Sequence, residues 1–364
     1  ILKGKKDPIS NLLKKTSTGW NEFGQWFLPI GTKYQLYKTA KNFLKDKKVD
    51  IILATGEPFI LFKYASKLSR KFNIPWVADY RDPWSQNSSR RKGLFFKYFI
   101  PILEKRYLKN VTFISTVSEY FSFNIQELVK NKPFVIIPNG YDENIINESI
   151  KINQNKEALT ISFAGTIYNW HPYISFLKAI SNFFIDKSNA NFKINFYGIN
   201  KEDSIIELIK NDENLKKIIT IYPKMSNNKL AMELAKSNIL LLFNYYSIMG
   251  TKIYDYLALN RKIILCFEDD EEANLLKEKH FKFKSIKGLS ESLQADLIRK
   301  TNSGIVVKDS EHLYEVLNDL CNEFEEKSYI ENHTIDAENY SRKVQTEKLV
   351  NKLKQIENYD NQKL

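Results

Sequence analysis

The chain has 364 residues and a formal net charge of +12; 43% of its residues are hydrophobic and 27% are charged. These values predict a globular protein of about two domains, each with enough apolar residues for a core. Two cysteines exclude a disulfide framework and predict a reducing, cytoplasmic setting; four scattered histidines argue against a metal site, and no apolar run approaches the roughly 20 residues of a membrane span.

The net positive charge predicts that the protein binds an anionic partner. Nucleic acid, an anionic membrane surface and a small anionic substrate all fit a chain of this charge. No recognised nucleic-acid module and no interleaving of aromatic and basic residues accompanies the charge, so nucleic acid is the least favoured of the three.

The first part of the chain alternates predicted strands and helices. Strands are predicted at 49–54, 74–78, 111–117 and 134–137, and helices at 34–47, 59–72, 94–109 and after Ser118, which is expected to cap its helix. A segment rich in Asn, Glu, Lys and Ile follows at 144–157 and is predicted to be a linker.

The alternation resumes after the linker. Strands are predicted at 159–164, 192–197, 218–222, 239–243, 262–267 and 305–307, and helices from 172, around 205, and at 228–236, 252–259, 271–279, 311–325 and 337–356. This spacing predicts parallel βαβ units and an α/β fold class, with two Rossmann-like domains facing across a cleft where ligands bind. The predicted domains are residues 1–143 and 158–335.

The segment from Ile239 to Leu259 carries the main candidate site. An apolar strand leads through a loop to Gly250 and to Thr251, a good N-cap, and then to a helix with Lys252 and Asp255 on one face. A lysine in the first turn is repelled by the positive end of the helix dipole, which destabilises the helix by roughly 0.3–1 kcal/mol. A bound anion would make the lysine favourable there, because the anion attracts both the lysine and the free helix amides. A phosphate with a sugar beside it fits both side chains. The alternative is a solvated helix start with incidental charges.

Two further loops after strands carry unusual residues. Asp79, Arg81 and Asp82 follow one strand, and Gly165 with Thr166 follows another. Charged residues packed after an apolar strand are not needed for folding and predict a catalytic or binding role. The alternative is a structural Arg–carboxylate network that braces the loop.

Five motifs in this order resemble those of bacterial glycosyltransferases of the GT-B fold, in the family 4-like group that builds surface polysaccharides. They are 74–84 (Ile-Pro-Trp-Val-Ala-Asp-Tyr-Arg-Asp-Pro-Trp), 115–119 (Ser-Thr-Val-Ser-Glu), 137–142 (Ile-Pro-Asn-Gly-Tyr-Asp), 163–166 (Phe-Ala-Gly-Thr) and 250–258 (Gly-Thr-Lys-Ile-Tyr-Asp-Tyr-Leu-Ala). The resemblance implies a nucleotide-sugar donor in the C-terminal half, an acceptor in the N-terminal half, retention of configuration, and no cofactor or metal requirement. It also implies that the first strands of the N-terminal domain are missing and that 336–364 forms a helix crossing back to that domain.

The resemblance assigns roles to individual residues. Lys252 falls where such enzymes contact the donor diphosphate, Asp255 where an acidic residue holds the ribose, and Gly165 where backbone approaches the phosphates. The catalytic candidates are Asp79, Arg81 and Asp82, which would orient acceptor or sugar. Four positions depart from the family pattern: Thr166 and His171 stand where many relatives have arginine and lysine, Ser247 where they have an acidic residue, and Arg81 where they often have histidine. These departures keep two alternatives open, a nucleotide-sugar epimerase of the same fold and a non-catalytic nucleotide-sugar-binding relative.

The resemblance further implies an acceptor carried on a polyprenyl lipid, and therefore a first domain at the inner membrane face. Trp20, Trp26 and Phe27 lie near Lys14 and Lys15, and the stretch 90–97 combines basic with bulky apolar residues. Both stretches predict a peripheral contact with an anionic bilayer. The alternative is that 94–99 packs its apolar face into the domain core.

Overall fold

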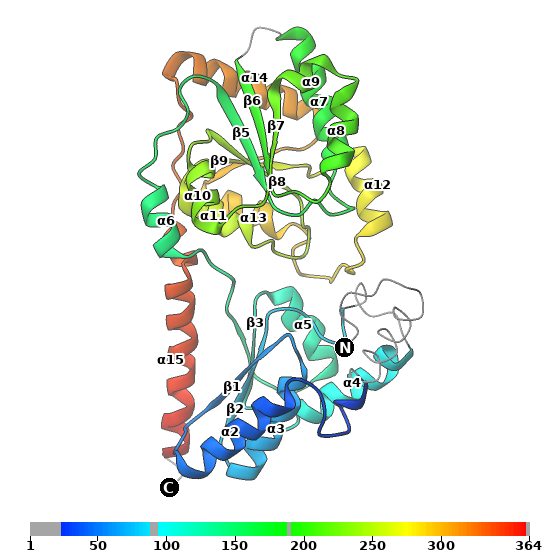
Figure 1. Cartoon of the computed structure of the whole chain (residues 1–364), viewed down its shortest axis with the longest axis vertical. Coiled ribbons are helices and arrows are strands. Elements are labelled where there is room, and N and C mark those ends of the chain that lie inside the picture. The colour runs from blue at the N-terminus through cyan, green and yellow to red at the C-terminus, as the bar shows by residue number, and fades with distance from the viewer. Residues whose placement is uncertain (1–22, 88–93, 188–190, 362–364) are drawn as a thin grey trace, which may run out of the picture. The chain divides into compact units, whose positions relative to one another are not determined.

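The computed structural model describes residues 23–87, 94–187 and 191–361 (Figure 1). The chain divides into two compact units. Unit 1 comprises Ile1–Ile137 with Leu349–Leu364, and unit 2 comprises Pro138–Lys348. Each unit is built on its own parallel sheet.

Unit 1 contains a four-stranded sheet in the order β1-β2-β3-β4, with all neighbouring strands parallel. Its strands are β1 (Ile52–Gly56), β2 (Trp76–Tyr80), β3 (Phe113–Thr116) and β4 (Phe134–Ile136), and its helices are α2 (Tyr34–Asp46), α3 (Ile60–Phe72), α4 (Leu94–Leu108) and α5 (Glu119–Leu128). Ser118 caps α5 as expected, because its hydroxyl accepts a hydrogen bond of 3.2 Å from the Phe121 amide.

The strand β2 is buried on both faces, as is usual for parallel sheets. Trp76 and Tyr80 pack in a cluster with side chains of α3 and α4. On the opposite face Val77 packs against Leu349 of α15 (Arg342–Asn361). The part of α15 from Leu349 onward therefore completes the core of unit 1, although it lies more than 200 residues from β3 in the sequence.

One predicted membrane-facing residue is part of this core. Trp26 is 7% exposed, and its ring lies 5.2 Å from Trp84 and 6.2 Å from Tyr107. The prediction of a lipid contact for Trp26 is wrong, because neighbouring aromatic rings enclose it. Phe27 is 54% exposed. Lys14, Lys15, Trp20 and the basic run 90–92 lie outside the described residues.

Unit 2 contains a six-stranded parallel sheet in the order β10-β9-β8-β5-β6-β7. The strands are β5 (Leu159–Ala164), β6 (Phe192–Tyr197), β7 (Ile219–Tyr222), β8 (Ile239–Phe243), β9 (Lys262–Cys266) and β10 (Gly304–Val306). The helices are α6 (Glu143–Ser149), α7 (Tyr173–Asp186), α8 (Glu202–Lys210), α9 (Glu213–Ile218), α10 (Asn227–Ala235), α11 (Lys252–Leu259), α12 (Glu271–His280), α13 (Leu293–Thr301) and α14 (Ser310–Lys327), with a 3₁₀ turn, η1 (Ala337–Tyr340), before α15.

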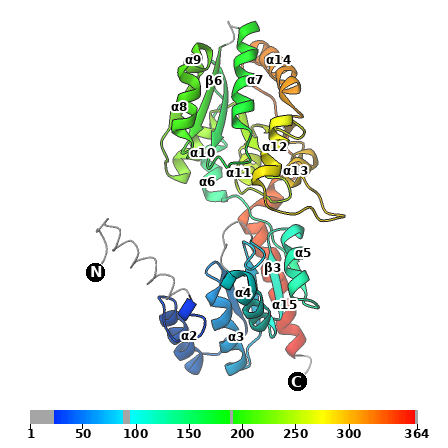
Figure 2. The same ribbon diagram turned by 90° about the vertical axis from the view of Figure 1, so that its right-hand side faces the viewer.

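Alternate residues of the central strands of unit 2 face two separate cores. Ile239 and Leu241 of β8 pack in one cluster with α7 and α14, and Leu240 and Leu242 pack in the other with α11 and α13. Helices therefore cover both faces of the sheet (Figures 1 and 2), which is the layered architecture expected for a parallel α/β unit.

Four features of unit 2 differ from the sequence prediction. The segment 144–157 carries α6, which packs on α10 and α11, and the helices α9 and α13 were not predicted. The helix predicted at 337–356 is interrupted at Ser341, which is extended. The interruption arises because the Arg342 amide donates to the Tyr141 carbonyl (2.9 Å), and Tyr141 in turn donates to Tyr340 (3.1 Å). Among the described helices, none has the length and apolar character needed to cross a bilayer.

Candidate functional site

The candidate site in unit 2 lies where the strand order of its sheet reverses. The chain runs from β5 outward to β6 and β7, then returns to place β8 on the other side of β5. Because all strands are parallel, the loops after β5 and β8 leave the same edge of the sheet side by side. Ligands of open α/β sheets bind at this reversal point. Gly165 and Thr166 follow β5, and Gly250 to Asp255 come after β8.

Gly165 has a backbone that only glycine adopts readily. Its φ is +115°, and a side-chain carbon placed there would meet no heavy atom within 4 Å. Its amide donates to the Tyr197 carbonyl at the end of β6 (3.1 Å). Thr166 is exposed directly after it. The combination leaves uncrowded backbone at the sheet edge, where a phosphate could approach closely.

Lys252 and Asp255 form an ion pair at the start of α11. The ammonium lies 3.1 Å from the carboxylate, and the two side chains are 32% and 34% exposed. Thr251 does not cap the helix as predicted, because its backbone is helical (φ −76°, ψ −28°) whereas a capping side chain needs an extended one. The first turn of α11 therefore presents a positive group and a negative group, both reachable from solvent, beside helix amides that Thr251 does not cover.

The loop between β8 and α11 is held by the helix α13. The Tyr245 amide donates to the buried Gln294 side chain (2.7 Å), and the Leu293 amide donates to the Tyr246 carbonyl (3.0 Å). Tyr246 is left-handed (φ 54°), and its amide donates to Asn244 (2.8 Å). These bonds fix the path of the backbone that delivers α11. Sequence inspection missed Gln294, because the contact depends on the packing of α13 against the sheet.

His171 is buried in an aromatic cluster after β5, with 1% of its surface exposed. Its ring packs against Phe243, Tyr245 and Tyr168, and its Nδ1 accepts a hydrogen bond from the Tyr168 amide (3.2 Å). Burial lowers the pKa of His171 to about 3, so the imidazole is neutral near pH 7. A neutral ring supplies no positive charge to a phosphate, so its place in the structure is to shape the loop that starts at Gly165.

In unit 1, Asp79 joins three neighbouring strands. Thr55 of β1, Asp79 of β2 and Ser115 of β3 are register partners. The Asp79 carboxylate accepts hydrogen bonds from both hydroxyls (3.2 and 2.8 Å) and pairs with the Arg81 Nε at 3.0 Å. Asp79 is 4% exposed. This is the geometry of the bracing network, and it occupies the carboxylate that was predicted to be catalytic.

Arg81 and Asp82 lie at the carboxyl edge of the unit 1 sheet and are half-buried. Arg81 also donates from Nη1 to the Ile137 carbonyl (3.3 Å), and its side chain is 35% exposed. Trp84, two residues further on, stacks on Phe59 with ring centroids 5.1 Å apart. The residues of the motif 74–84 therefore fall into two groups. Asp79 and Trp84 lie in the interior of unit 1, whereas Arg81 and Asp82 are partly exposed to solvent.

Unit 1 also holds a buried carboxylate that the sequence analysis did not single out. Glu104 of α4 is fully buried and accepts hydrogen bonds from the Tyr80 hydroxyl (2.8 Å), the Ser85 amide (3.1 Å) and the Gln86 side chain (3.2 Å). Burial raises the pKa of Glu104. Since all three donors come from the segment at and after β2, Glu104 fixes the loop that contains Arg81 and Asp82. A charged residue within an apolar helical stripe was the signal available in the sequence.

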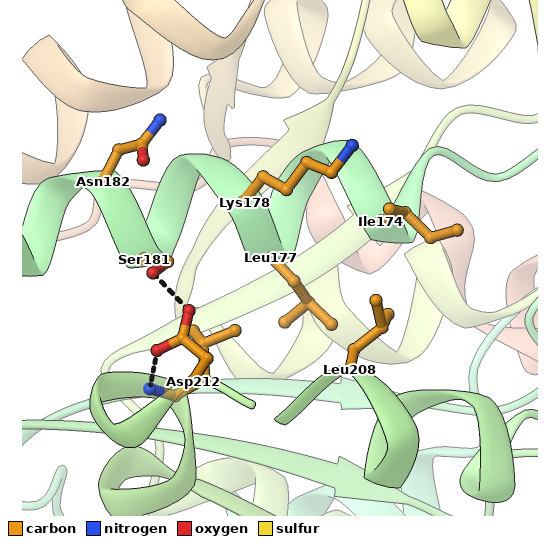
Figure 3. A pocket seen from close by; sticks show the side chains of 8 residues that line it. Ile174, Leu177, Lys178, Ser181, Asn182, Leu208 and Asp212 are labelled. Atoms are coloured by element: carbon orange, nitrogen blue, oxygen red, sulfur yellow. Dashed lines mark hydrogen bonds between the residues drawn. The ribbon is translucent and has the colours of Figure 1, made fainter. Parts of the chain in front are cut away.

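Unit 2 also has a small cavity that is separate from the candidate site at the loops after β5 and β8. It lies between α7, α8 and α9, has a volume of about 170 Å³, and is shown in Figure 3. Leu177 and Leu208 point into it, and Ser181 donates to Asp212. Asp212 is already committed as the cap of α9. In the described part of the chain, no three or more His, Cys, Asp or Glu side chains are grouped as they would need to be to hold a metal ion.

Comparisons with known proteins agree with this architecture. Residues 18–144 match the family model described as Glycosyltransferase Family 4. No curated protein matches the chain.

Solved structures share its fold at low sequence identity. The Anabaena protein Alr3699/HepE, in complex with UDP, has a TM-score of 0.57 at 12% identity, covering 88% of this chain and 81% of that one. TarM has a TM-score of 0.54 at 13% identity over 87% of this chain, which spans only 58% of TarM. Sucrose-phosphate synthase from Thermosynechococcus elongatus has a TM-score of 0.52 at 13% identity, with 79% and 68% covered. The chain therefore has the GT-B type of α/β fold, with two parallel-sheet units, and its first unit matches a glycosyltransferase family model.

Proposed function

We propose that the protein is a glycosyltransferase that transfers a hexose-type sugar from a nucleotide-sugar donor to a glycan or lipid-linked acceptor in the synthesis of a cell-surface polysaccharide. The observation that carries the proposal is that Gly165, after β5, and the start of α11, after β8, follow neighbouring strands at the same edge of the unit 2 sheet, where the strand order reverses. The family match of residues 18–144 and the UDP complex of a protein with the same fold support it.

In this proposal the donor diphosphate lies between the loop after β5 and the first turn of α11. Uncrowded backbone at Gly165 and Thr166 accepts the phosphates at close range, and Gly250 and Thr251 deliver the amides of α11. The Lys252 ammonium neutralises charge on the leaving diphosphate, which is the main electrostatic demand of the reaction. Asp255, released from Lys252, accepts hydrogen bonds from the ribose hydroxyls.

The transfer breaks the bond between the anomeric carbon and the diphosphate oxygen and forms a bond from that carbon to an acceptor oxygen. The acceptor proton passes to the leaving diphosphate on the same face, so the anomeric configuration is retained and no strong base is required. Arg81 and Asp82 orient the acceptor or sugar, and Asp79 holds Arg81 in place. Lys252 and the helix amides supply the positive charge, so we propose that the reaction needs no metal ion or other cofactor. The enzyme works in the cytoplasm at the inner membrane face.

The proposal is tested by incubating the protein with a panel of nucleotide sugars, with and without polyprenyl-phosphate-linked acceptors. The expected result is release of nucleoside diphosphate that depends on the acceptor and persists in EDTA. Conversion of the donor to an epimer without acceptor would identify an epimerase instead. Binding of nucleotide sugar with neither reaction, across the panel, would identify a non-catalytic relative.

A further inference from the structure

The helices that cover the centre of the unit 2 sheet leave part of one face open at β6 and β7. Ile194 and Phe196 of β6 are buried in the core with residues of α7, α8 and α9. The residues that alternate with them, Lys193, Asn195 and Tyr197, face the opposite side of the sheet. That side of β6 is therefore polar, apart from the ring of Tyr197.

A groove of about 280 Å³ runs over this polar face. Strand β7 contributes Thr220, the register partner of Asn195, and Tyr222, the register partner of Tyr197. Since β7 is the last strand of the described sheet on this side, the groove is open at its outer edge. We call it the β6–β7 groove.

Tyr197 and Tyr222 form a flat aromatic platform at one end of the groove. Their ring centroids are 4.9 Å apart, and the ring planes differ by 12°. Tyr197 is 4% exposed, whereas Tyr222 is 37% exposed. The outer ring thus rests on the inner one and presents apolar surface to solvent. A tyrosine held in this way offers a large rigid contact area at a low cost in conformational entropy.

Hydrogen-bonding groups lie beside the platform. The half-buried Asn195 carries an amide that can donate and accept, and the exposed Thr220 carries a hydroxyl that can do both. Lys193 is exposed further along β6 and can donate. A ligand that lies on the Tyr222 ring would find these groups around its rim.

The charges of the groove do not favour an anionic ligand. Helix α10 contributes Glu233 and Lys236, which pair with each other at 2.9 Å. This pair leaves the ammonium of Lys193 as the remaining charge among the residues that line the described groove. An extended peptide is also a poor match, because such peptides are recognised through pockets for alternate side chains, and the apolar surface here is a flat ring.

We propose that the β6–β7 groove binds a neutral oligosaccharide, with one sugar ring stacked on Tyr222 and its hydroxyls bonded to Asn195, Thr220 and Lys193. A pyranose presents C–H groups on its flat face and hydroxyls around its rim, which matches a ring bordered by polar side chains. The volume is close to the lower end of the about 300–1,000 Å³ typical of small-ligand sites, so the groove holds a short stretch of a glycan.

The β6–β7 groove is separate from the candidate donor site, whose residues follow β5 and β8. Binding of a glycan in the groove does not require the donor site. Its use, to hold a glycan chain while a sugar is transferred to that chain, rests on the proposed function.

The test is calorimetric titration of the full-length protein with four neutral hexasaccharides: maltohexaose, cellohexaose, laminarihexaose and N-acetylchitohexaose. At least one of them should bind. Tyr222→Ala should weaken that binding roughly tenfold or more, because the aromatic contact is lost, whereas Tyr222→Phe keeps the ring and should bind within about twofold of the unaltered protein. Thr220→Val removes a hydroxyl at nearly constant shape and should weaken binding about threefold. Thermal melting verifies that each variant is folded.

A matched control separates the groove from exposed aromatic surface in general. Tyr98 of α4 in unit 1 is 57% exposed, so the expectation that 94–99 packs into the core is wrong for this residue. Tyr98→Ala should bind the hexasaccharide like the unaltered protein. Equal losses in Tyr98→Ala and Tyr222→Ala, or no binding of any of the four sugars, would overturn the proposal.

Two further outcomes would assign the binding elsewhere. Loss of binding in Asp82→Asn with normal binding in Tyr222→Ala would place the sugar at the proposed acceptor residues and overturn the groove. A change of oligomeric state in Tyr222→Ala with sugar binding intact would identify the groove as a contact between copies of the chain. Titration with UDP and other nucleoside diphosphates tests the proposed function separately: sugar binding without any nucleotide binding would reject the transferase and leave the groove.

Discussion

The pair formed by Lys252 and Asp255 determines what each residue can do for a ligand. In the structure they neutralise one another at 3.1 Å, with about a third of each side chain exposed. An exposed pair of this kind contributes only about 0–1 kcal/mol to folding. Lysine ahead of aspartate is also the less favourable order on a helix. The pair therefore contributes little to the stability of the fold, and an incoming diphosphate can replace Asp255 as the partner of Lys252.

We predict that Lys252→Ala weakens nucleoside-diphosphate binding by about 1–3 kcal/mol, the range for hydrogen bonds to charged groups. The melting temperature should change little. Calorimetric titration with a series of nucleoside diphosphates measures the effect. Lys236→Ala is the matched control, because Lys236 and Glu233 form an ion pair with the same spacing at 2.9 Å in the same unit. Equal affinities of the Lys252 variant and this control would contradict the prediction.

His171 makes the stability of unit 2 depend on pH. Burial lowers its pKa from 6.5 to about 3, so between these values the unfolded chain binds a proton that the folded chain does not. The free energy of unfolding must then fall as pH decreases through this window, by about 1.4 kcal/mol per pH unit once the unfolded histidine is protonated.

We predict that His171→Phe removes this component of the pH dependence. Urea unfolding at pH 7, 6, 5 and 4 should show a shallower loss of stability for the variant than for the unaltered protein. His333→Gln serves as the control, since the His333 side chain is 75% exposed. Parallel pH profiles for His171→Phe and the unaltered protein would show that His171 is not held neutral.

At the scale of elements, sequence patterns predicted the strands and helices that are defined by their own residues, and missed features that depend on packing against other elements. The strands β5, β6 and β8 and the helix α11 were predicted with the bounds that the structure has, because a glycine or an asparagine follows the last residue of each. The helix α13 has a mixed polar sequence and was missed. Its contact through Gln294 exists only because it packs beside the loop after β8.

The candidate site shows the same division. The charges at Lys252 and Asp255 stand one helical turn apart and could be predicted from the sequence alone. The partners of Asp79 could not, because they depend on the register of three strands. Nor could the burial of His171, since its enclosing rings include Phe243 at the end of β8 and Tyr245 in the loop after it, both more than 70 residues away in the sequence.

Asp79 and Asp82 are expected to have different roles. The strand register places two hydroxyl partners beside Asp79, so Asp79 braces the fold, whereas Asp82 is proposed to act on a ligand. Asp79→Ala would remove the acceptor of two hydroxyls and of Arg81, at a cost on the order of 2–3 kcal/mol. We predict a melting temperature lower by several degrees for this variant. Asp82→Asn, which keeps the shape of a half-buried side chain, should leave the melting temperature almost unchanged and reduce sugar transfer strongly. Thermal unfolding and acceptor-dependent turnover measure both; loss of stability in Asp82→Asn with normal turnover would assign it to the bracing network instead.

At the scale of the whole chain, the C-terminal helix determines whether unit 1 has a complete core. Leu349, which is 9% exposed, packs with Val77, Phe113 and Ile137, and Leu353 and Ile356 lie against the same cluster. The sheet face that contains Val77 is covered by residues from the far end of the sequence. Unit 1 should therefore be less stable whenever this helix is perturbed, although its strands are contiguous in the sequence.

We predict that Leu349→Ala destabilises unit 1 by about 2 kcal/mol or more, the lower part of the range for buried leucine, because the cavity opens at the edge of the cluster. Hydrogen exchange followed by mass spectrometry should show faster exchange in β2 and β3, with unit 2 unchanged. Val350→Ala is the control on the same helix, since Val350 is 39% exposed and lies outside the cluster. Faster exchange throughout unit 2, or equal effects of the two substitutions, would show that α15 stabilises the chain by some means other than packing on the unit 1 sheet.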